Sequence, residues 1–158
     1  MLKYPMTKNS YEKIQKELNS LQRIERIKII HEIKLAREHG DLSENAEYHA
    51  AKEKQSFIEA KITSLKNMFH NAEIIDTKST QFNKNKIQFG ATITLLDKKS
   101  NKKKIYKIVG EYESDLKNGL ISINSPLIKV ILGKQKLYSF EFSTSKGTKS
   151  YTILDIKY

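Results

Sequence analysis

Gly40 is the only glycine among the first 89 residues, and it divides a long stretch that otherwise has almost no helix breakers. Before it, apolar residues recur at steps of three and four, as on one face of a helix: Ile14, Leu18, Leu21, then Ile29 or Ile30, Ile33 and Ala36. After it, the same spacing joins Ile58, Ile62, Leu65, Phe69 and Ala72. Because glycine suits the C-terminal cap of a helix, the pattern predicts two antiparallel helices joined near Gly40.

Two details refine this predicted hairpin. Thr7, Asn9 and Ser10 supply side-chain oxygens that can cap the start of the first helix. The apolar register blurs between Arg23 and Lys28, which indicates a skip in the heptad pattern. With roughly 30 residues per helix and a rise of about 1.5 Å per residue, the hairpin should be about 45 Å long. Its distal half is therefore expected to project into solvent or into a partner.

The second half of the chain has a different pattern. Residues 76–86 are polar and aperiodic, which predicts a linker. Alternating apolar residues then predict strands over 87–95, 121–123, 138–142 and 151–155, and residues 145–148 predict a hairpin turn. Ser125 and Pro126 predict the start of a short helix that Gly133 ends. The expected class is α+β, with a coiled-coil hairpin over 1–75 whose tip lies at about 39–47, and a mostly antiparallel sheet domain over 87–158.

Composition narrows the possible chemistry. The chain has no cysteine, so disulfides and thiolate metal sites are excluded. No apolar run approaches the roughly 18 residues of a membrane helix, and the first residues lack the apolar core of a signal peptide. We therefore expect a cytoplasmic protein without a membrane partner.

The formal charge of +11 lies almost entirely in the second half. Residues 1–75 hold 13 Lys and Arg against 11 Asp and Glu, whereas residues 76–158 hold 16 against 7. A lysine cluster is predicted to form an exposed turn, with a phosphate-binding site as the alternative: Lys98, Lys99, Lys102, Lys103 and Lys104.

Asp41 and Glu44 are the candidate functional residues at the predicted tip. Their spacing fits a capping box, with Asp41 as the N-cap of the second helix, and Ser43 is an alternative cap. It also fits two ligands of one divalent cation, because side chains at this spacing are close neighbours. Mg²⁺ requires about six oxygens, so two carboxylates would form an incomplete site whose missing ligands come from another macromolecule.

The run from Ala36 to Glu53, AREHGDLSENAEYHAAKE, resembles the tip motif of the bacterial Gre transcript-cleavage factors. The similarity extends along the chain through five further segments: Tyr4–Thr7, Phe89–Thr92, Ile108–Gly110, Ile121–Pro126 and Leu132–Lys134. The resemblance implies an N-terminal coiled-coil hairpin and an FKBP-like C-terminal domain. It also implies an accessory factor, acting as a monomer, that enters the secondary channel of RNA polymerase.

In that resemblance, Asp41 and Glu44 help the polymerase to hold a Mg²⁺ ion that cleaves the 3′ end of the nascent RNA. The factor has no cofactor of its own, and the hydrolytic site belongs to the polymerase. Arg37 and Lys52 are expected to contact the RNA, although exposed helix charges are commonly only solvated. Asn45 is also an expected contact, and it either orients the two acids or caps the second helix. Three further residues are expected contacts, each with a structural alternative as a cap or packing residue: Tyr48, Ser125 and Pro126.

Three other functions remain open from the sequence. The chain could occupy the same channel without promoting cleavage. It could be a peptidyl-prolyl isomerase, an activity suggested only by the FKBP-like architecture. It could also bind nucleic acid on its own, which its basic second half would favour.

Overall fold

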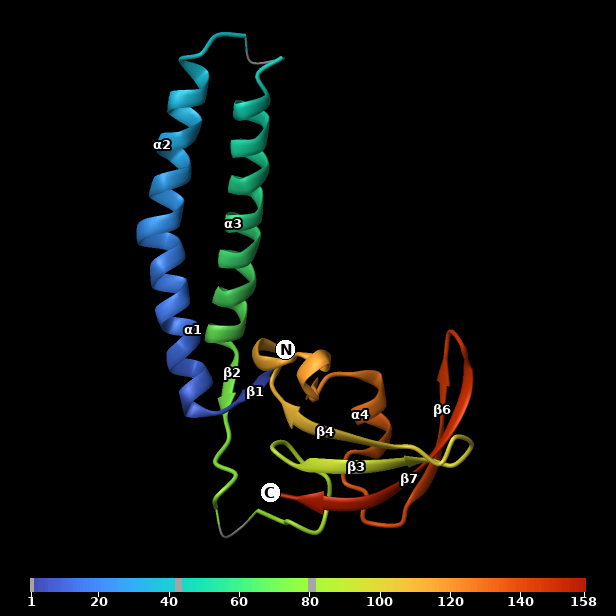
Figure 1. Cartoon of the computed structure of the whole chain (residues 1–158). Coiled ribbons are helices and arrows are strands. Elements are labelled where there is room, and N and C mark those ends of the chain that lie inside the picture. The colour runs from blue at the N-terminus through green and yellow to red at the C-terminus, as the bar shows by residue number, and fades with distance from the viewer. Residues whose placement is uncertain (1, 42–43, 80–81) are drawn as a thin grey trace. The chain divides into compact units, whose positions relative to one another are not determined.

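A computed structural model describes residues 2–41, 44–79 and 82–158. These residues form two compact units (Figure 1). The first contains Asn9–Ala72, and the second contains Tyr4–Lys8 together with Glu73–Tyr158. Residues 4–8, which the sequence placed in the hairpin, therefore group with the second unit.

The first unit is the predicted antiparallel helical hairpin, in which α2 and α3 lie side by side (Figure 1). Its first arm consists of α1 (Lys8–Ser20), the segment η1 (Leu21–Glu25) and α2 (Arg26–Arg37), and its second arm is α3 (Ala46–His70). The predicted seam is buried at most positions, including Ile14, Leu21, Ile29, Ile33, Ala36, Ile58, Ile62 and Leu65. The expectation that Ala72 extends this helix is wrong, because α3 ends at His70.

The segment η1 is a π-helix, and it explains the blurred register. Leu21 and Ile29 are both buried, yet they are eight residues apart, one more than a heptad. A π-turn accommodates one extra residue within a helix. The predicted skip is confirmed, and its physical form is a π-bulge that returns Ile29 to the seam.

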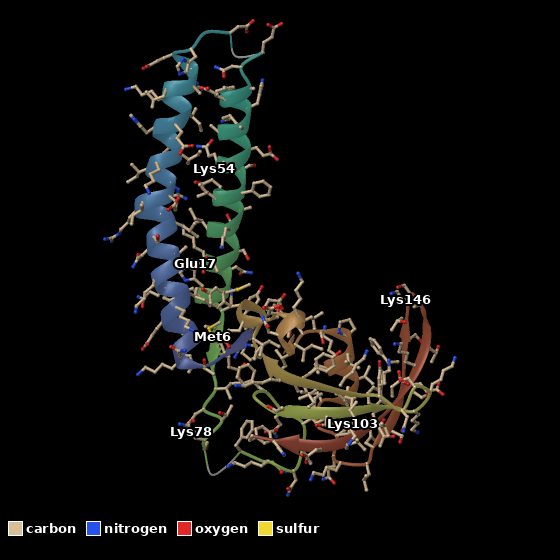
Figure 2. All side chains as sticks on the ribbon, in the orientation of Figure 1. Met6, Glu17, Lys54, Lys78, Lys103 and Lys146 are labelled. Atoms are coloured by element: carbon tan, nitrogen blue, oxygen red, sulfur yellow. The ribbon has the colours of Figure 1, made fainter. Side chains whose placement is uncertain are left out.

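Side chains from the two arms pair along the hairpin. Arg26 donates to Glu59 through Nε at 2.7 Å and through Nη2 at 2.8 Å. Further ion pairs join Glu17 to Lys61 at 2.7 Å and Glu32 to Lys54 at 3.6 Å; Glu17 and Lys54 are labelled in Figure 2. Near the base, the rings of Tyr11 and Phe69 stack with centroids 4.6 Å apart. These contacts fix which residues of the arms face each other.

Two short strands, β1 (Tyr4–Met6) and β2 (Ala72–Ile74), pair with each other. Met6 is buried, and its carbonyl accepts a hydrogen bond from the Ile75 amide. Gly110 approaches this part of the chain so closely that an added Cβ would lie 2.5 Å from the Pro5 carbonyl oxygen. The strand β1 is thus fitted against the segment that follows β4.

The sheet of the second unit has the strand order β5-β4-β3-β7-β6. Its strands are β3 (Thr92–Asp97), β4 (Lys103–Val109), β5 (Leu120–Ser122), β6 (Ser139–Thr144) and β7 (Gly147–Lys157). All neighbours are antiparallel except β4 and β5, which are parallel. The short helix α4 (Pro126–Ile131) contributes Ile128 and Ile131 to the buried face that contains Ile93, Leu95 and Ile153. The predicted α+β class and the turn between β6 and β7 are confirmed.

One strand prediction is wrong, and one strand was not predicted. The alternation from Ile87 to Leu95 does not form one strand, because a turn at Gly90, with φ of +89°, precedes β3. Ile87, Phe89 and Ala91 are nevertheless buried. Strand β4 was not expected, since lysines conceal its alternation of Tyr106 and Ile108.

The lysine cluster is split by β4. Lys98 and Lys99 lie in the predicted turn, where the Asp97 carboxylate accepts hydrogen bonds from the Lys99 and Ser100 amides. These bonds outweigh the effect of burial and hold the pKa of Asp97 below its ordinary value. Lys103, labelled in Figure 2, and Lys104 belong to the strand instead. Within the described ranges, we find no helix that is long and apolar enough to cross a membrane.

Candidate functional site

The second arm of the hairpin begins at an asparagine cap. Asn45 has an extended backbone, with φ of −85° and ψ of 99°, and its Oδ1 accepts a hydrogen bond from the Tyr48 amide at 3.0 Å. The capping box predicted from Asp41 and Glu44 is therefore wrong, since both residues precede the true N-cap. The alternative cap, Ser43, lies outside the described residues. The capping role considered for Asn45 is confirmed.

The same Asn45 side chain also contacts the first arm. Its Nδ2 donates a hydrogen bond of 2.6 Å to the carbonyl oxygen of Ala36, in the last turn of α2. Asn45 is half-buried, and Ala36 is buried. One amide group thus uses both its acceptor and its donor, and it joins the beginning of α3 to the end of α2.

The first arm ends as its single glycine predicts. The amides of His39 and Gly40 donate to the carbonyls of Ala36 and Arg37, at 3.2 Å and 3.4 Å. Gly40 has a φ of +118°, in the region that favours glycine. The connection between the helices therefore leaves α2 through a tight turn directly before Asp41.

Asp41 and Glu44 are both exposed on this connection. Glu44 directly precedes the N-cap of α3, where the positive end of the helix dipole favours a carboxylate. Among the described residues, no group of three or more His, Asp or Glu side chains could hold a metal ion. Carboxylate oxygens are suitable donors for Mg²⁺, but two side chains supply only part of its shell of about six oxygens.

Arg37 and Lys52 come from opposite arms and line one groove of about 440 Å³. The groove is also lined by Ile30, Ile33, Lys34, Glu38 and Gln55. Lys34 was missed from the sequence, although it lies three residues before Arg37 and so belongs to the same helix face. This face of the hairpin therefore has a groove that is lined by apolar residues and by three cationic side chains.

Tyr48 packs across the hairpin, as its structural alternative predicted. The Arg37 guanidinium lies 5.8 Å from the centroid of the Tyr48 ring, within the range of a cation–π contact. The ring is half-buried. Arg37 and Tyr48 therefore form a second contact between the two arms beside the tip.

A different groove, of about 450 Å³, has His39 and Glu47 in its lining together with Glu32, Ala50 and Lys54. His39 Nε2 lies 3.7 Å from Glu47 Oε2, and both side chains are largely exposed. This lining carries two carboxylates and one lysine, whereas the groove of Arg37 carries three cations and one carboxylate. The two grooves near the tip thus differ in charge.

Ser125 and Pro126 lie in the second unit at the start of α4. Ser125 Oγ accepts a hydrogen bond from the Ile128 amide at 3.4 Å, and Pro126 is the exposed first residue of the helix. Their capping function is confirmed, while their expected contact with a polymerase stays a prediction. A hollow of about 310 Å³ in the same unit has polar walls that include Lys84, Gln135 and Lys136.

Comparisons with known proteins cover both units. A family described as "Transcription elongation factor, N-terminal" matches residues 4–74, and one described as "Transcription elongation factor, GreA/GreB, C-term" matches residues 82–158. The chain therefore belongs to the GreA/GreB family of transcription elongation factors.

Two GreA proteins are similar to this chain over nearly the whole length of both sequences. Transcription elongation factor GreA of Paracoccus denitrificans is 49% identical over 158 residues, covering 100% of this chain and 99% of the relative. GreA of Rickettsia canadensis is 46% identical over 156 residues, covering 99% and 95%. A crystal structure of GreA factor homolog 1 (Gfh1) from Thermus thermophilus is 23% identical, covers 99% of both chains and has a TM-score of 0.47.

Proposed function

We propose that this protein enters the secondary channel of bacterial RNA polymerase and stimulates cleavage of the nascent RNA 3′ end in backtracked complexes. In this role it is an accessory factor, because the hydrolytic site belongs to the polymerase. Membership of the transcription elongation factor family supports a role in elongation. The resemblance of the tip motif to transcript-cleavage factors supports the more specific role.

The observation that carries this proposal is the position of two exposed carboxylates on the connection that joins the two arms of a helical hairpin. Asp41 and Glu44 would provide oxygen ligands to a Mg²⁺ ion shared with the polymerase. Carboxylate oxygens are the type of ligand that Mg²⁺ prefers, but two side chains supply fewer oxygens than the ion requires. This shortfall is consistent with a site that a partner completes. In two-metal hydrolysis, the ions activate the attacking oxygen and stabilise the leaving one.

The cationic groove suits the other partner, the extruded RNA. Lys34, Arg37 and Lys52 place positive charge beside the tip, where they would attract phosphate groups. The exposed part of Tyr48 could stack on an unpaired base while its other face packs near Arg37. These residues would hold the RNA in place without taking part in proton transfer.

The test is RNA cleavage in a stalled elongation complex with the Asp41→Asn and Glu44→Gln variants. Each substitution removes one charged ligand and nearly preserves side-chain volume. We expect the stimulated cleavage rate to fall by roughly 10²-fold or more, the usual loss when a group that stabilises transition-state charge is removed. Glu53→Gln is the matched control, because it makes the same change at an exposed position in α3 away from the connection.

The outcome also separates the proposal from its closest alternative. If both variants stimulate cleavage as the parent does, the carboxylates hold no catalytic ion and the proposed function is wrong. If neither the parent nor the variants stimulate cleavage, while all compete equally for the channel, the protein is a channel-binding module instead.

A further inference from the structure

We propose that Asn45 is a positioning residue: its side-chain amide joins the two arms and thereby fixes the carboxylates of Asp41 and Glu44. This inference rests on the proposed function, and it assigns Asn45 an effect on the two carboxylates that requires no contact between Asn45 and the metal. Two hydrogen bonds carry it, from the Tyr48 amide to Asn45 Oδ1 at 3.0 Å and from Asn45 Nδ2 to the Ala36 carbonyl at 2.6 Å.

The chemistry of the site requires an amide of this length. The carboxylate of aspartate could cap α3 but has no donor for Ala36, and the hydroxyl of serine can cap while lacking the second polar group. The orientation of the amide is also determined. A flipped Asn45 would place its NH₂ group against the Tyr48 amide and its oxygen against the Ala36 carbonyl, so neither hydrogen bond would form.

The two bonds connect the ends of the segment that carries the acids. Asp41 lies five residues after Ala36, and Glu44 directly precedes Asn45. The Asn45–Ala36 hydrogen bond holds the residue after Glu44 against the last turn of α2, and Asp41 directly follows Gly40, which is bonded to that same turn. The separation of the two carboxylates is thereby limited before any metal arrives, and such preorganisation is what a catalytic ligand pair needs.

Loss of the Ala36 contact should leave both helices intact. The Ala36 carbonyl also accepts from the His39 amide at 3.2 Å, so the last turn of α2 keeps a bond of its own. The seam below, including Ile33 and Ile58, is unaffected. Asn45→Ser retains a good N-cap residue and removes only the donor to Ala36. Asn45→Asp does the same and adds a charge, so the two variants separate the effect of the lost contact from that of charge.

The first measurement is the cleavage rate at saturating factor, with its dependence on Mg²⁺ and on factor concentration. For Asn45→Ser we expect a 10- to 100-fold lower rate, the scale of loss that follows from about 1 Å of misplacement. More Mg²⁺ should be required for the half-maximal rate, and the factor concentration required for half-maximal stimulation should stay as in the parent. A purely stabilising role would leave the Mg²⁺ dependence unchanged.

The second measurement reports on the tip without any catalysis. Because the chain contains no cysteine, Glu38→Cys with Ala46→Cys allows two nitroxide labels to be placed on either side of the connection. Dipolar broadening between the labels should give one narrow distance distribution in the parent. The distribution should widen in Asn45→Ser and in Asn45→Asp, while the helical circular dichroism stays unchanged.

The outcomes distinguish this inference from the proposed function. If Asp41→Asn is inactive but Asn45→Ser keeps the parent's rate, Mg²⁺ dependence and distance distribution, the positioning role is wrong and the proposed function stands. If Asp41→Asn and Glu44→Gln are as active as the parent, the proposed function fails, and an unchanged label distribution would then overturn the positioning role too. Should Asn45→Ser prove unstable, Asn45→Thr provides the same comparison, because threonine also caps a helix and lacks the side-chain amide without adding a charge.

Discussion

The π-bulge in the first arm leads to a prediction about chain length. Deleting Ile24, which is 50% exposed within η1, would change the spacing between Leu21 and Ile29 from eight residues to seven. At about 100° per residue, eight residues turn about 80° too far to return to the same helix face, whereas seven fall only about 20° short. The shortened arm can therefore be a continuous α-helix that keeps both residues in the seam.

We expect this deletion to be tolerated, with a change in the free energy of unfolding within about 0.5 kcal/mol, as for an ordinary surface change. The matched control is deletion of Lys16, an exposed residue in α1. That deletion reduces the spacing from Ile14 to Leu21 to six residues, about 120° short of the seam. Expelling fully buried Ile14 costs roughly 1.5–3 kcal/mol, and losing the Tyr11–Phe69 stack adds about 0.5–1.5 kcal/mol.

Urea unfolding followed by circular dichroism at the helical band measures this difference, because most of the helix lies in the hairpin. The expected result is a parent-like transition for the Ile24 deletion and an earlier one for the Lys16 deletion. Equal destabilisation of the two variants would show that η1 does not absorb an extra residue, and the explanation of the register would be wrong.

Two further predictions concern stability. The hydrogen bonds from Arg26 hold the pKa of Glu59 below its ordinary value. The stabilisation by this pair is therefore present above about pH 4.3 and is lost as pH falls through the lowered pKa. The melting temperatures of the parent and of Glu59→Gln should differ at pH 7 and converge at acid pH, and a difference that persists in acid would contradict this. Gly110→Ala places a Cβ against the Pro5 carbonyl and should lower the free energy of unfolding in urea by roughly 1–3 kcal/mol. The control Lys117→Ala changes an exposed position and should leave this free energy unchanged. Equal unfolding midpoints for the two variants would refute the clash.

The helical hairpin could be predicted from the sequence because its signals are local. A single glycine, a three-and-four apolar spacing and a blurred register correspond to the turn at Gly40, the buried seam and the π-bulge. The strands were predicted less well. The buried positions Ile87, Phe89 and Ala91 alternate as in a strand, yet the backbone forms a turn there and not a strand. The burial of a side chain depends on tertiary packing and not on strand pairing alone.

The tip shows a similar division. The two acids are predicted from their residue types and spacing, whereas Arg37 and Lys52 are predicted from the resemblance to the Gre factors, and the functions of all four residues stay predictions. The identity of the N-cap was not predicted, because Asp41, Ser43 and Asn45 are all good capping residues and the sequence does not rank them strongly. The contact of Asn45 with Ala36 joins residues nine positions apart on different helices, and only the packing of the two arms reveals it.

The ion pairs between the arms also carry a consequence for natural variation. Arg26 faces Glu59, Glu17 faces Lys61 and Glu32 faces Lys54, so each of these six charges has an opposite charge on the other arm. A charge reversal at one of these positions places like charges together unless its counterpart reverses as well. The two residues of each pair should therefore covary during evolution. The sequences of relatives would then show which residues of the two arms face each other.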